Sequence, residues 1–179
     1  LMALAVAYGY KNNIVVTKTF ESTVEFFKGE SLKETDLSNL IVSYSDHITE
    51  GYTCTTASWD KLVNLVTADN MHYVAHHLKD GYRSADKVIP GFNLLILDVD
   101  SDVSLDTAKL LLQDYTYLMA TTKRHTDKAN RFRIILPMSH ILKLNPEQYK
   151  QFMSNVFDWL PFKVDEATSD IARKWATHN

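Results

Sequence analysis

Residues 94–102 read LLILDVDSD, and this stretch decides the fold. Four large apolar residues run together and are followed by Asp98 and Asp100, one residue apart. Such an apolar run is typical of a strand that is buried on both faces. Side chains of a strand alternate between its faces, so both carboxylates point to the same side, with Cα atoms ~7 Å apart. Two like charges on one face repel each other unless something positive lies between them.

Helical and strand patterns follow this stretch in turn. Apolar residues recur at helical spacing, each time after a good N-cap residue, in segments 104–115 and 145–160. Strand patterns occupy four segments: 93–100, 116–122, 131–138 and 162–167. The order over residues 93–167 is β-α-β-β-α-β, the ferredoxin-like or RNA-recognition-motif (RRM-like) pattern. Its first and last strands are neighbours, so Asp165 is predicted to lie close to Asp98 and Asp100.

The first half of the chain, residues 1–92, has a less regular pattern. Strands are favoured at 12–20 and at 71–84, the latter with a turn at Gly81, and helices at 23–29 and 59–70. We expect this N-terminal α/β part to widen the sheet of the core, with a small separate layer as the alternative. The fold class is therefore α+β, and we expect residues 1–179 to form one domain.

Composition places the chain among ordinary globular proteins. Apolar residues make up 45% of it and charged residues 23%. Cys54 is the only cysteine, which excludes a disulfide framework and a Cys-rich zinc site and fits a reducing compartment such as the cytoplasm. The apolar run at 1–8 is too short for a membrane span, so we expect no membrane partner. The abrupt start and the polar end RKWATHN suggest a fragment of a longer protein.

The charge of the chain is uneven. The net charge is −3, yet the segment KRHTDKANRFR (123–133) contains five basic residues and one acid. A local cluster of this kind can bind phosphate, because arginine makes bidentate contacts and His125 can donate a hydrogen bond. Arg131 and Arg133 share one face of their strand and belong to the site only if that face carries the acids. The alternative is a solvated hairpin loop.

Three carboxylates on one surface, from Asp98, Asp100 and Asp165, suit Mg²⁺ or Mn²⁺ and the two-metal chemistry of phosphoryl transfer. The alternative is a strand that ends in a solvated, acidic turn.

Asp170 and Arg173 are spaced as a helical ion pair, which is an alternative to a role for Arg173 in the site. The histidines of MHYVAHH (His72, His76 and His77) are interpreted as partly buried residues, because no third zinc ligand is evident.

These motifs, in this order, resemble the archaeo-eukaryotic primase (AEP) superfamily, in particular the primase-polymerase domains of phages and plasmids. LLILDVD matches the Asp-x-Asp motif of that family, and KVD, ending at Asp165, matches its third motif. KRH, ending at His125, matches the second motif loosely, since Lys123 stands where the family often has serine. The resemblance covers residues 70–175.

The resemblance implies a DNA primase or polymerase that transfers nucleotides from NTPs or dNTPs on a single-stranded DNA template during replication. Asp98, Asp100 and Asp165 would hold two divalent ions, Mg²⁺ or Mn²⁺, and His125 would contact the phosphates of the incoming nucleotide. Further nucleotide contacts would come from the basic residues Lys123, Arg124, Arg131, Arg133 and Arg173. Larger members often carry a C-terminal helicase, and the expected location is the cytoplasm of a host cell of a phage or plasmid.

Two other functions compete with this one. A haloacid-dehalogenase-like phosphatase would use Asp98 as a nucleophile, but the β-α-β-β-α-β order differs from the repeated β-α-β order of that fold. A non-catalytic RRM-like module would bind nucleic acid through exposed aromatic residues on its central strands. This chain has acids at that place.

Overall fold

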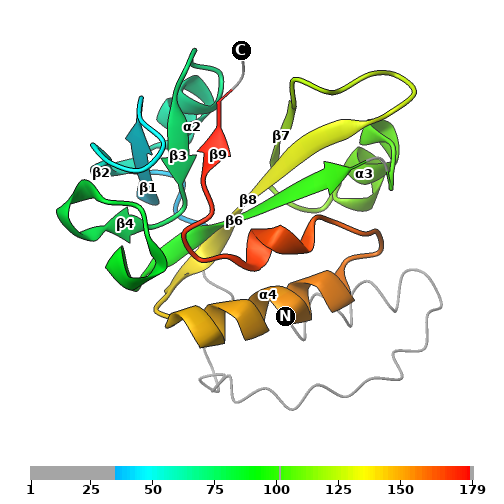
Figure 1. Ribbon diagram of the computed structural model, residues 1–179. Helices are drawn as coiled ribbons and strands as arrows, with labels where there is room; N and C mark the ends of the chain where they lie inside the picture. Colours follow the sequence, from blue (N-terminus) through cyan, green and yellow to red (C-terminus); the bar gives the residue numbers. More distant parts are fainter. Residues whose placement is uncertain (1–34, 101, 178–179) are drawn as a thin grey trace. The chain divides into compact units, whose positions relative to one another are not determined.

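The computed structural model describes residues 35–100 and 102–177 and confirms the α+β class (Figure 1). Its strands are β1 (Leu40–Ser45), β2 (Thr53–Ala57), β3 (His72–Val74), β4 (His77–Leu78), β5 (Val88–Ile89), β6 (Phe92–Asp100), β7 (Leu118–Thr121), β8 (Arg131–Leu142) and β9 (Trp175–Ala176). Its helices are α2 (Trp59–Val66), α3 (Leu105–Leu111), α4 (Pro146–Trp159) and the short 3₁₀ helices Lys79–Gly81, Ala85–Lys87 and Glu166–Ser169. No helix within these residues is long and apolar enough to cross a membrane. The predicted elements at 12–20 and 23–29 lie outside the described residues.

The strands form separate sheets, and all their pairings are antiparallel. The core sheet has the order β6-β8-β7, and a second sheet has the order β2-β1-β3-β9. A small third sheet joins β4 to β5. The prediction that the N-terminal half widens the core sheet is therefore wrong. Its strands pair with one another and with β9 from the C-terminal end, and they reach β6 by side-chain packing.

The helix starts agree with the prediction. Ser104 caps α3 by accepting a hydrogen bond from the backbone of Thr107, and Asn145 forms a reciprocal capping box with Gln148 at the start of α4. The predicted strand at 162–167 is wrong. Its place beside β6 is taken by an irregular segment that leads into the 3₁₀ helix Glu166–Ser169.

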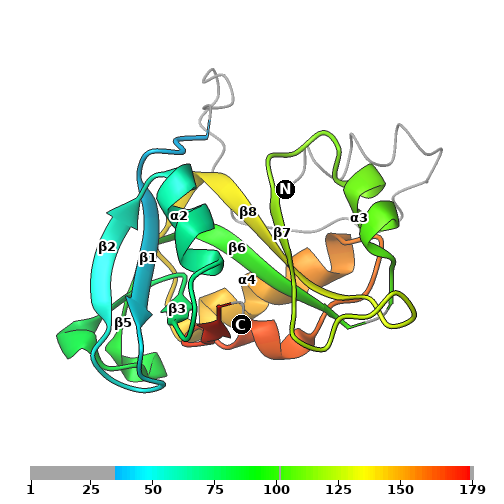
Figure 2. The same ribbon diagram turned by 90° about the horizontal axis from the view of Figure 1, so that it is seen from above.

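The double burial of β6 has a simple cause. Alternate residues of β6 and β8 pack on α3 and α4 in one cluster, which includes Leu95, Leu97 and Phe132. The residues between them, such as Leu94 and Ile96, pack on β1, β3 and α2 in another cluster. The two views show these layers on either side of β6 and β8 (Figures 1 and 2). Asp98 and Asp100 continue the row of Leu94 and Ile96, so they face away from α3 and α4.

Asn93 joins the two sheets by hydrogen bonds and provides a test of their packing. Its buried amide accepts from the Ile41 N–H at 2.8 Å and donates to the Asn39 carbonyl at 2.9 Å. Asn93→Ala leaves both backbone groups without this partner, and we expect it to lower the free energy of unfolding by about 2–4 kcal/mol. Urea denaturation measures the loss. Asn64→Ala, on the exposed side of α2, is the matched control, and an equal effect of both substitutions would contradict the prediction.

Candidate functional site

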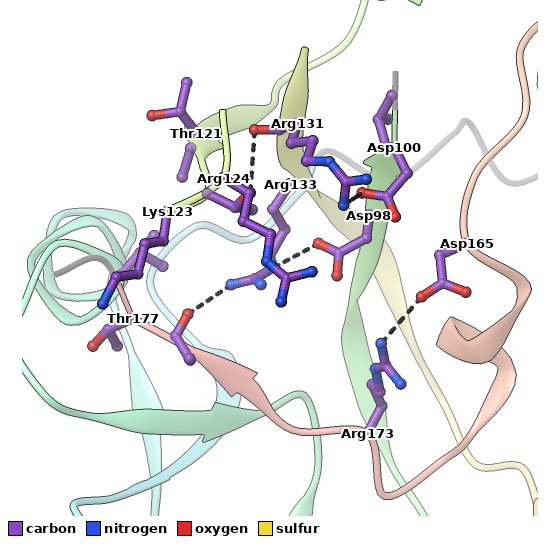
Figure 3. A pocket seen from close by; sticks show the side chains of 15 residues that line it. Asp98, Asp100, Thr121, Lys123, Arg124, Arg131, Arg133, Asp165, Arg173 and Thr177 are labelled. Atoms are coloured by element: carbon purple, nitrogen blue, oxygen red, sulfur yellow. Dashed lines mark hydrogen bonds and ion pairs between the residues drawn. The ribbon is translucent and has the colours of Figure 1, made fainter. Parts of the chain in front are cut away.

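The two aspartates of LLILDVDSD lie opposite two arginines of the neighbouring strand. In the antiparallel register of β6 and β8, Asp98 pairs with Arg133 and Asp100 pairs with Arg131. Opposed residues of such a pair project to the same face. The Nε of Arg133 lies 3.1 Å from Oδ1 of Asp98, and Nη1 of Arg131 lies 2.9 Å from Oδ1 of Asp100 (Figure 3). The protein itself therefore relieves the repulsion between the two carboxylates.

The third acid, Asp165, lies beside the first, as predicted. Its backbone N–H donates to the carbonyl of Asp98 at 2.9 Å, which is the contact that replaces the predicted last strand. Its carboxylate accepts from the backbone of Ala167 at 2.9 Å and from Nη2 of Arg173 at 3.1 Å. Arg173 therefore pairs with Asp165. The alternative ion pair with Asp170 is wrong, because the Asp170 carboxylate accepts a hydrogen bond from the backbone N–H of Ala172 instead.

These acids and arginines line one pocket of about 400 Å³. Its lining residues are Val66, Asp98, Val99, Asp100, Ala120, Thr121, Thr122, Lys123, Arg124, Arg131, Arg133, Asp165, Arg173, Ala176 and Thr177. All the predicted site residues except His125 are among them. With five basic side chains and three acids, the pocket carries a positive excess in an acidic chain. It therefore suits a ligand with several negative charges.

The three ion pairs lie at different depths. Asp98 and Arg133 are only 20% and 11% exposed, whereas Asp100 is 57% exposed. Burial raises the pKa of Asp98 above its ordinary value of 3.8, and the nearby Arg133 and Arg173 offset only part of this effect. Asp98 is therefore the carboxylate most in need of a positive partner, and Asp100 is the one most open to a ligand.

Arg133 also connects the two sheets through residues that the sequence reasoning missed. Its Nη1 donates to the hydroxyl of Tyr73 at 3.2 Å and to the carbonyl of Ala176 at 2.9 Å. Its guanidinium carbon lies 4.7 Å from the ring centroid of Trp175, which is a cation–π distance. Tyr73 stands in MHYVAHH, where the sequence analysis weighed only the histidines.

The loop between β7 and β8 supplies basic side chains whose charges are not cancelled. Lys123 and Arg124 are exposed and line the pocket, and neither makes an ion pair with an acid of the described residues. Figure 3 shows Arg124 reaching from this loop toward the arginines of the strand. These two side chains are free to meet an anionic ligand.

His125 does not line the pocket, although it lies in the same loop. Its backbone N–H donates to the carbonyl of Thr122, and its Nδ1 accepts the backbone N–H of Arg131 at 3.1 Å. Since Nδ1 is the acceptor, a neutral ring carries its proton on Nε2. His125 thus closes the turn that positions Lys123 and Arg124, and its Nε2–H remains as a donor.

Comparison with known proteins places the chain in a family. The sequence model of the VapE N-terminal domain matches residues 33–175, a range that includes every predicted site residue. The chain belongs to the VapE N-terminal domain family. This match confirms the sequence-based recognition of a domain of the phage and plasmid replication type.

The VapE N-terminal domain was also compared with curated proteins and with solved structures. No curated protein matches it. Among solved structures, it is similar to the AEP domain of the primase-polymerase of cyanophage S-2L, with 10% sequence identity and a TM-score of 0.43. That similarity covers 79% of this chain and 74% of the other.

Divalent metal ions are implied for this VapE N-terminal domain by its resemblance to AEP enzymes. As the side chains lie, no three acid, histidine or cysteine residues within 35–100 and 102–177 are gathered closely enough to hold a metal ion. The donors themselves fit, because Asp98, Asp100 and Asp165 offer the carboxylate oxygens that Mg²⁺ and Mn²⁺ prefer, and all three line one pocket. A cation would have to displace Arg131 and Arg173, which now contact Asp100 and Asp165.

The histidines of MHYVAHH are buried or partly buried, as predicted. His76 is buried, and its ring packs against Phe92 and Tyr149 with centroid distances of 4.9 and 5.3 Å. His77 is half-buried, and its Nε2 lies 2.8 Å from the carbonyl of Thr55. In the VapE N-terminal domain these rings therefore belong to the core and its edge.

The burial of His76 predicts a pH-dependent stability. Burial lowers the pKa of His76 from its ordinary 6.5 to about 4. Between these values the unfolded chain binds a proton that the folded chain does not, so stability falls as the pH drops from 6.5 to 4. At about 1.4 kcal/mol per pKa unit, the full loss is about 3 kcal/mol. Urea denaturation between pH 7 and pH 4 measures it.

Substitution of His76 separates this effect from the titration of the acids. His76→Leu should remove most of the loss that His76 causes, whereas His140→Leu, at an exposed position, should keep all of it. If both variants lost stability equally on acidification, His76 would not be its source.

Proposed function

We propose that this VapE N-terminal domain is a DNA primase-polymerase. It would transfer nucleotides from NTPs or dNTPs to a growing strand on a single-stranded DNA template. The observation that carries the proposal is the pocket, where three carboxylates and five basic side chains converge at one end of the β6–β8 pair. Nucleotidyl transfer needs both kinds of group, because carboxylates bind the divalent ions and cations stabilise the charge of the triphosphate.

The proposed roles follow the positions of the side chains. Asp98, Asp100 and Asp165 would hold Mg²⁺ or Mn²⁺, and the bound ions would supply positive charge to the phosphates and to the attacking hydroxyl. Lys123 and Arg124, which make no ion pair with a described acid, would contact the triphosphate of the incoming nucleotide. The Nε2–H of His125, outside the pocket lining, would act with them as a donor if the loop moves inward.

The exposed arginines would change partners during the reaction. Arg131 and Arg173 are 33% and 35% exposed, and their partners Asp100 and Asp165 are 57% and 34% exposed. Such pairs contribute little to stability and break easily. A triphosphate offers these arginines stronger, bidentate contacts, which frees the two carboxylates for the divalent ions. Arg133 is too enclosed to exchange in this way and would remain beside Asp98.

Primer synthesis tests the proposal. The chain is incubated with single-stranded DNA, labelled NTPs or dNTPs and Mg²⁺ or Mn²⁺, with and without EDTA, and the products are separated by size. A metal-dependent product longer than one nucleotide supports the proposal. Extension of a supplied primer, measured in parallel, separates initiation from elongation. If the folded chain gave no product in either assay, nucleotidyl transfer by this domain would be excluded under these conditions.

One observation favours a second candidate, a non-catalytic nucleic-acid-binding module. Each of the three acids is already paired with an arginine, so the charge of each carboxylate is balanced without metal. Such a module would bind single-stranded oligonucleotides but make no product, and Asp100→Asn would not weaken the binding. The phosphatase alternative has no support from the fold, because β6 lies in an antiparallel sheet rather than in a repeated β-α-β arrangement.

A C-terminal helicase in the full-length protein remains a prediction. It would supply unwound template to the pocket and additional contacts to the DNA.

A further inference from the structure

A second group of basic side chains lies beside the pocket, on the edge formed by β3 and β9. His72 opens β3 and is in register with Ala176 of β9, while Lys174 directly precedes β9. Arg83 is fixed next to them, because its Nη1 donates to the carbonyl of Ala172 at 3.0 Å and its Nε donates to that of Ile48 at 2.8 Å. Segments far apart in sequence thus bring His72, Arg83 and Lys174 together.

No acid among the described residues balances this group. The contacts of Arg83 with Ile48 and Ala172 are to neutral backbone carbonyls, and Lys174 forms no ion pair with a described carboxylate. Burial lowers the pKa of Lys174, and the neighbouring charges that lower it further all belong to arginines. The pKa of His72 is likewise lowered by burial, then by Lys174 and Arg83.

Holding like charges together costs free energy, which an anion would recover. The group also has an unused polar atom. Nδ1 of His72 is buried and has no hydrogen-bond partner within the described part of the chain. When Nδ1 carries the ring proton, it can donate a hydrogen bond to a phosphate oxygen.

The position of the group indicates which anion it takes. Arg173, adjacent to Lys174 in sequence, lines the pocket, and so does Ala176, which faces His72 across the sheet. The group lies outside the pocket lining but close to it, since the charges of Arg173 and Arg133 also act on Lys174. A single triphosphate is satisfied within the pocket, whereas a polynucleotide carries further phosphates beyond it. Basic grooves that follow the backbone are the usual way to hold single strands.

We propose that Arg83, Lys174 and His72 bind backbone phosphates of a single-stranded nucleic acid whose reacting end lies in the pocket. The proposal rests on the proposed function only for the assignment of the pocket. It adds a binding path for the nucleic acid along the β3–β9 edge. It also explains how a chain of net charge −3 binds a polyanion.

The test measures binding of a 20-nucleotide, fluorescein-labelled oligo(dT) to the full 179-residue chain by fluorescence anisotropy at several KCl concentrations. Lys174→Gln removes one charge without disturbing the backbone contacts of Arg83. We expect the affinity to fall about 5- to 10-fold at low salt. The slope of log affinity against log salt should become shallower by about 0.7, the value for one phosphate contact of a single strand. Lys150→Gln, at an exposed position of α4, is the control and should change neither quantity.

Binding of dTTP with Mn²⁺, measured by calorimetry, identifies the phosphate source. We expect Lys174→Gln to leave it unchanged. If this variant weakened dTTP binding and spared oligo(dT), the group would serve the triphosphate and the proposal would be overturned. An unchanged salt slope, or an equal effect of Lys150→Gln, would also overturn it. Failure of the proposed function would appear differently, as absent primer synthesis with the oligo(dT) result intact.

Discussion

Asp98→Asn combined with Asp100→Asn is expected to lower metal-dependent primer synthesis by at least ~1000-fold, or about 4 kcal/mol in activation free energy. Asparagine keeps the size of both side chains but removes the two charges that would bind the divalent ions. The loss should exceed that of any single basic residue of the pocket, because Lys123, Arg124 and Arg131 can partly replace one another. Labelled-nucleotide incorporation on single-stranded DNA measures the effect.

Two controls separate this loss from misfolding. Asp100 is 57% exposed, so Asp100→Asn alone should keep the thermal stability of the wild type while losing most of the activity. Asp106→Asn on α3 is the matched acid, since its side chain is 92% exposed and lies outside the pocket. It should leave synthesis unchanged. Retention of activity within about two-fold by the folded double variant would show that these acids do not serve nucleotidyl transfer.

Much of this site could be predicted from the sequence because it depends on local periodicity. The alternation of a strand places Asp98 and Asp100 on one face, and the same rule places Arg131 and Arg133 together on their strand. Only the structure shows that the aspartates of β6 and the arginines of β8 lie on the same face of the sheet, because the antiparallel register places them opposite one another. The N-caps of α3 and α4 could be predicted for the same reason, because the side chains of Ser104 and Asn145 form hydrogen bonds within the first turn of their own helices.

The irregular segment after α4 was missed because a local bond competes with the strand. The Asp165 side chain accepts from the backbone of Ala167, two residues ahead, which turns the chain into a 3₁₀ helix. One backbone hydrogen bond to Asp98 then remains where a ladder was expected. The apolar-polar alternation of residues 162–167 could not reveal this competition.

The second sheet could not be read from the sequence because its last strand is only two residues long. Trp175 and Ala176 pair with Tyr73 and His72, more than 100 residues earlier. So short a segment has no periodicity, and what fixes it is the burial of Trp175 between the sheets and the hydrogen bond from Arg133 to the carbonyl of Ala176. The environment of Arg133 is therefore a tertiary property.

Arg133→Met is expected to lower the free energy of unfolding by about 3–5 kcal/mol, the usual cost of breaking a buried ion pair. Methionine fills part of the space but leaves Asp98, only 20% exposed, without its closest positive partner. It also removes the donor to Tyr73 and Ala176 and the stacking over Trp175, so β8 loses its polar contacts with β3 and β9. Urea denaturation at pH 7 measures the loss.

Arg131→Met provides a matched comparison, because it breaks a neighbouring ion pair on the same strand in a more exposed place. Its partner Asp100 is 57% exposed, so we expect a cost below about 1 kcal/mol. In a double-mutant cycle, Asp98→Asn should be less destabilising in the Arg133→Met background than alone, with a coupling of about 1–3 kcal/mol. Equal costs for the two arginines, or no coupling to Asp98, would mean that Arg133 does not hold the sheets together. The contrast also divides the arginines by role, since a residue that anchors both sheets cannot leave to follow a phosphate, whereas Arg131 can.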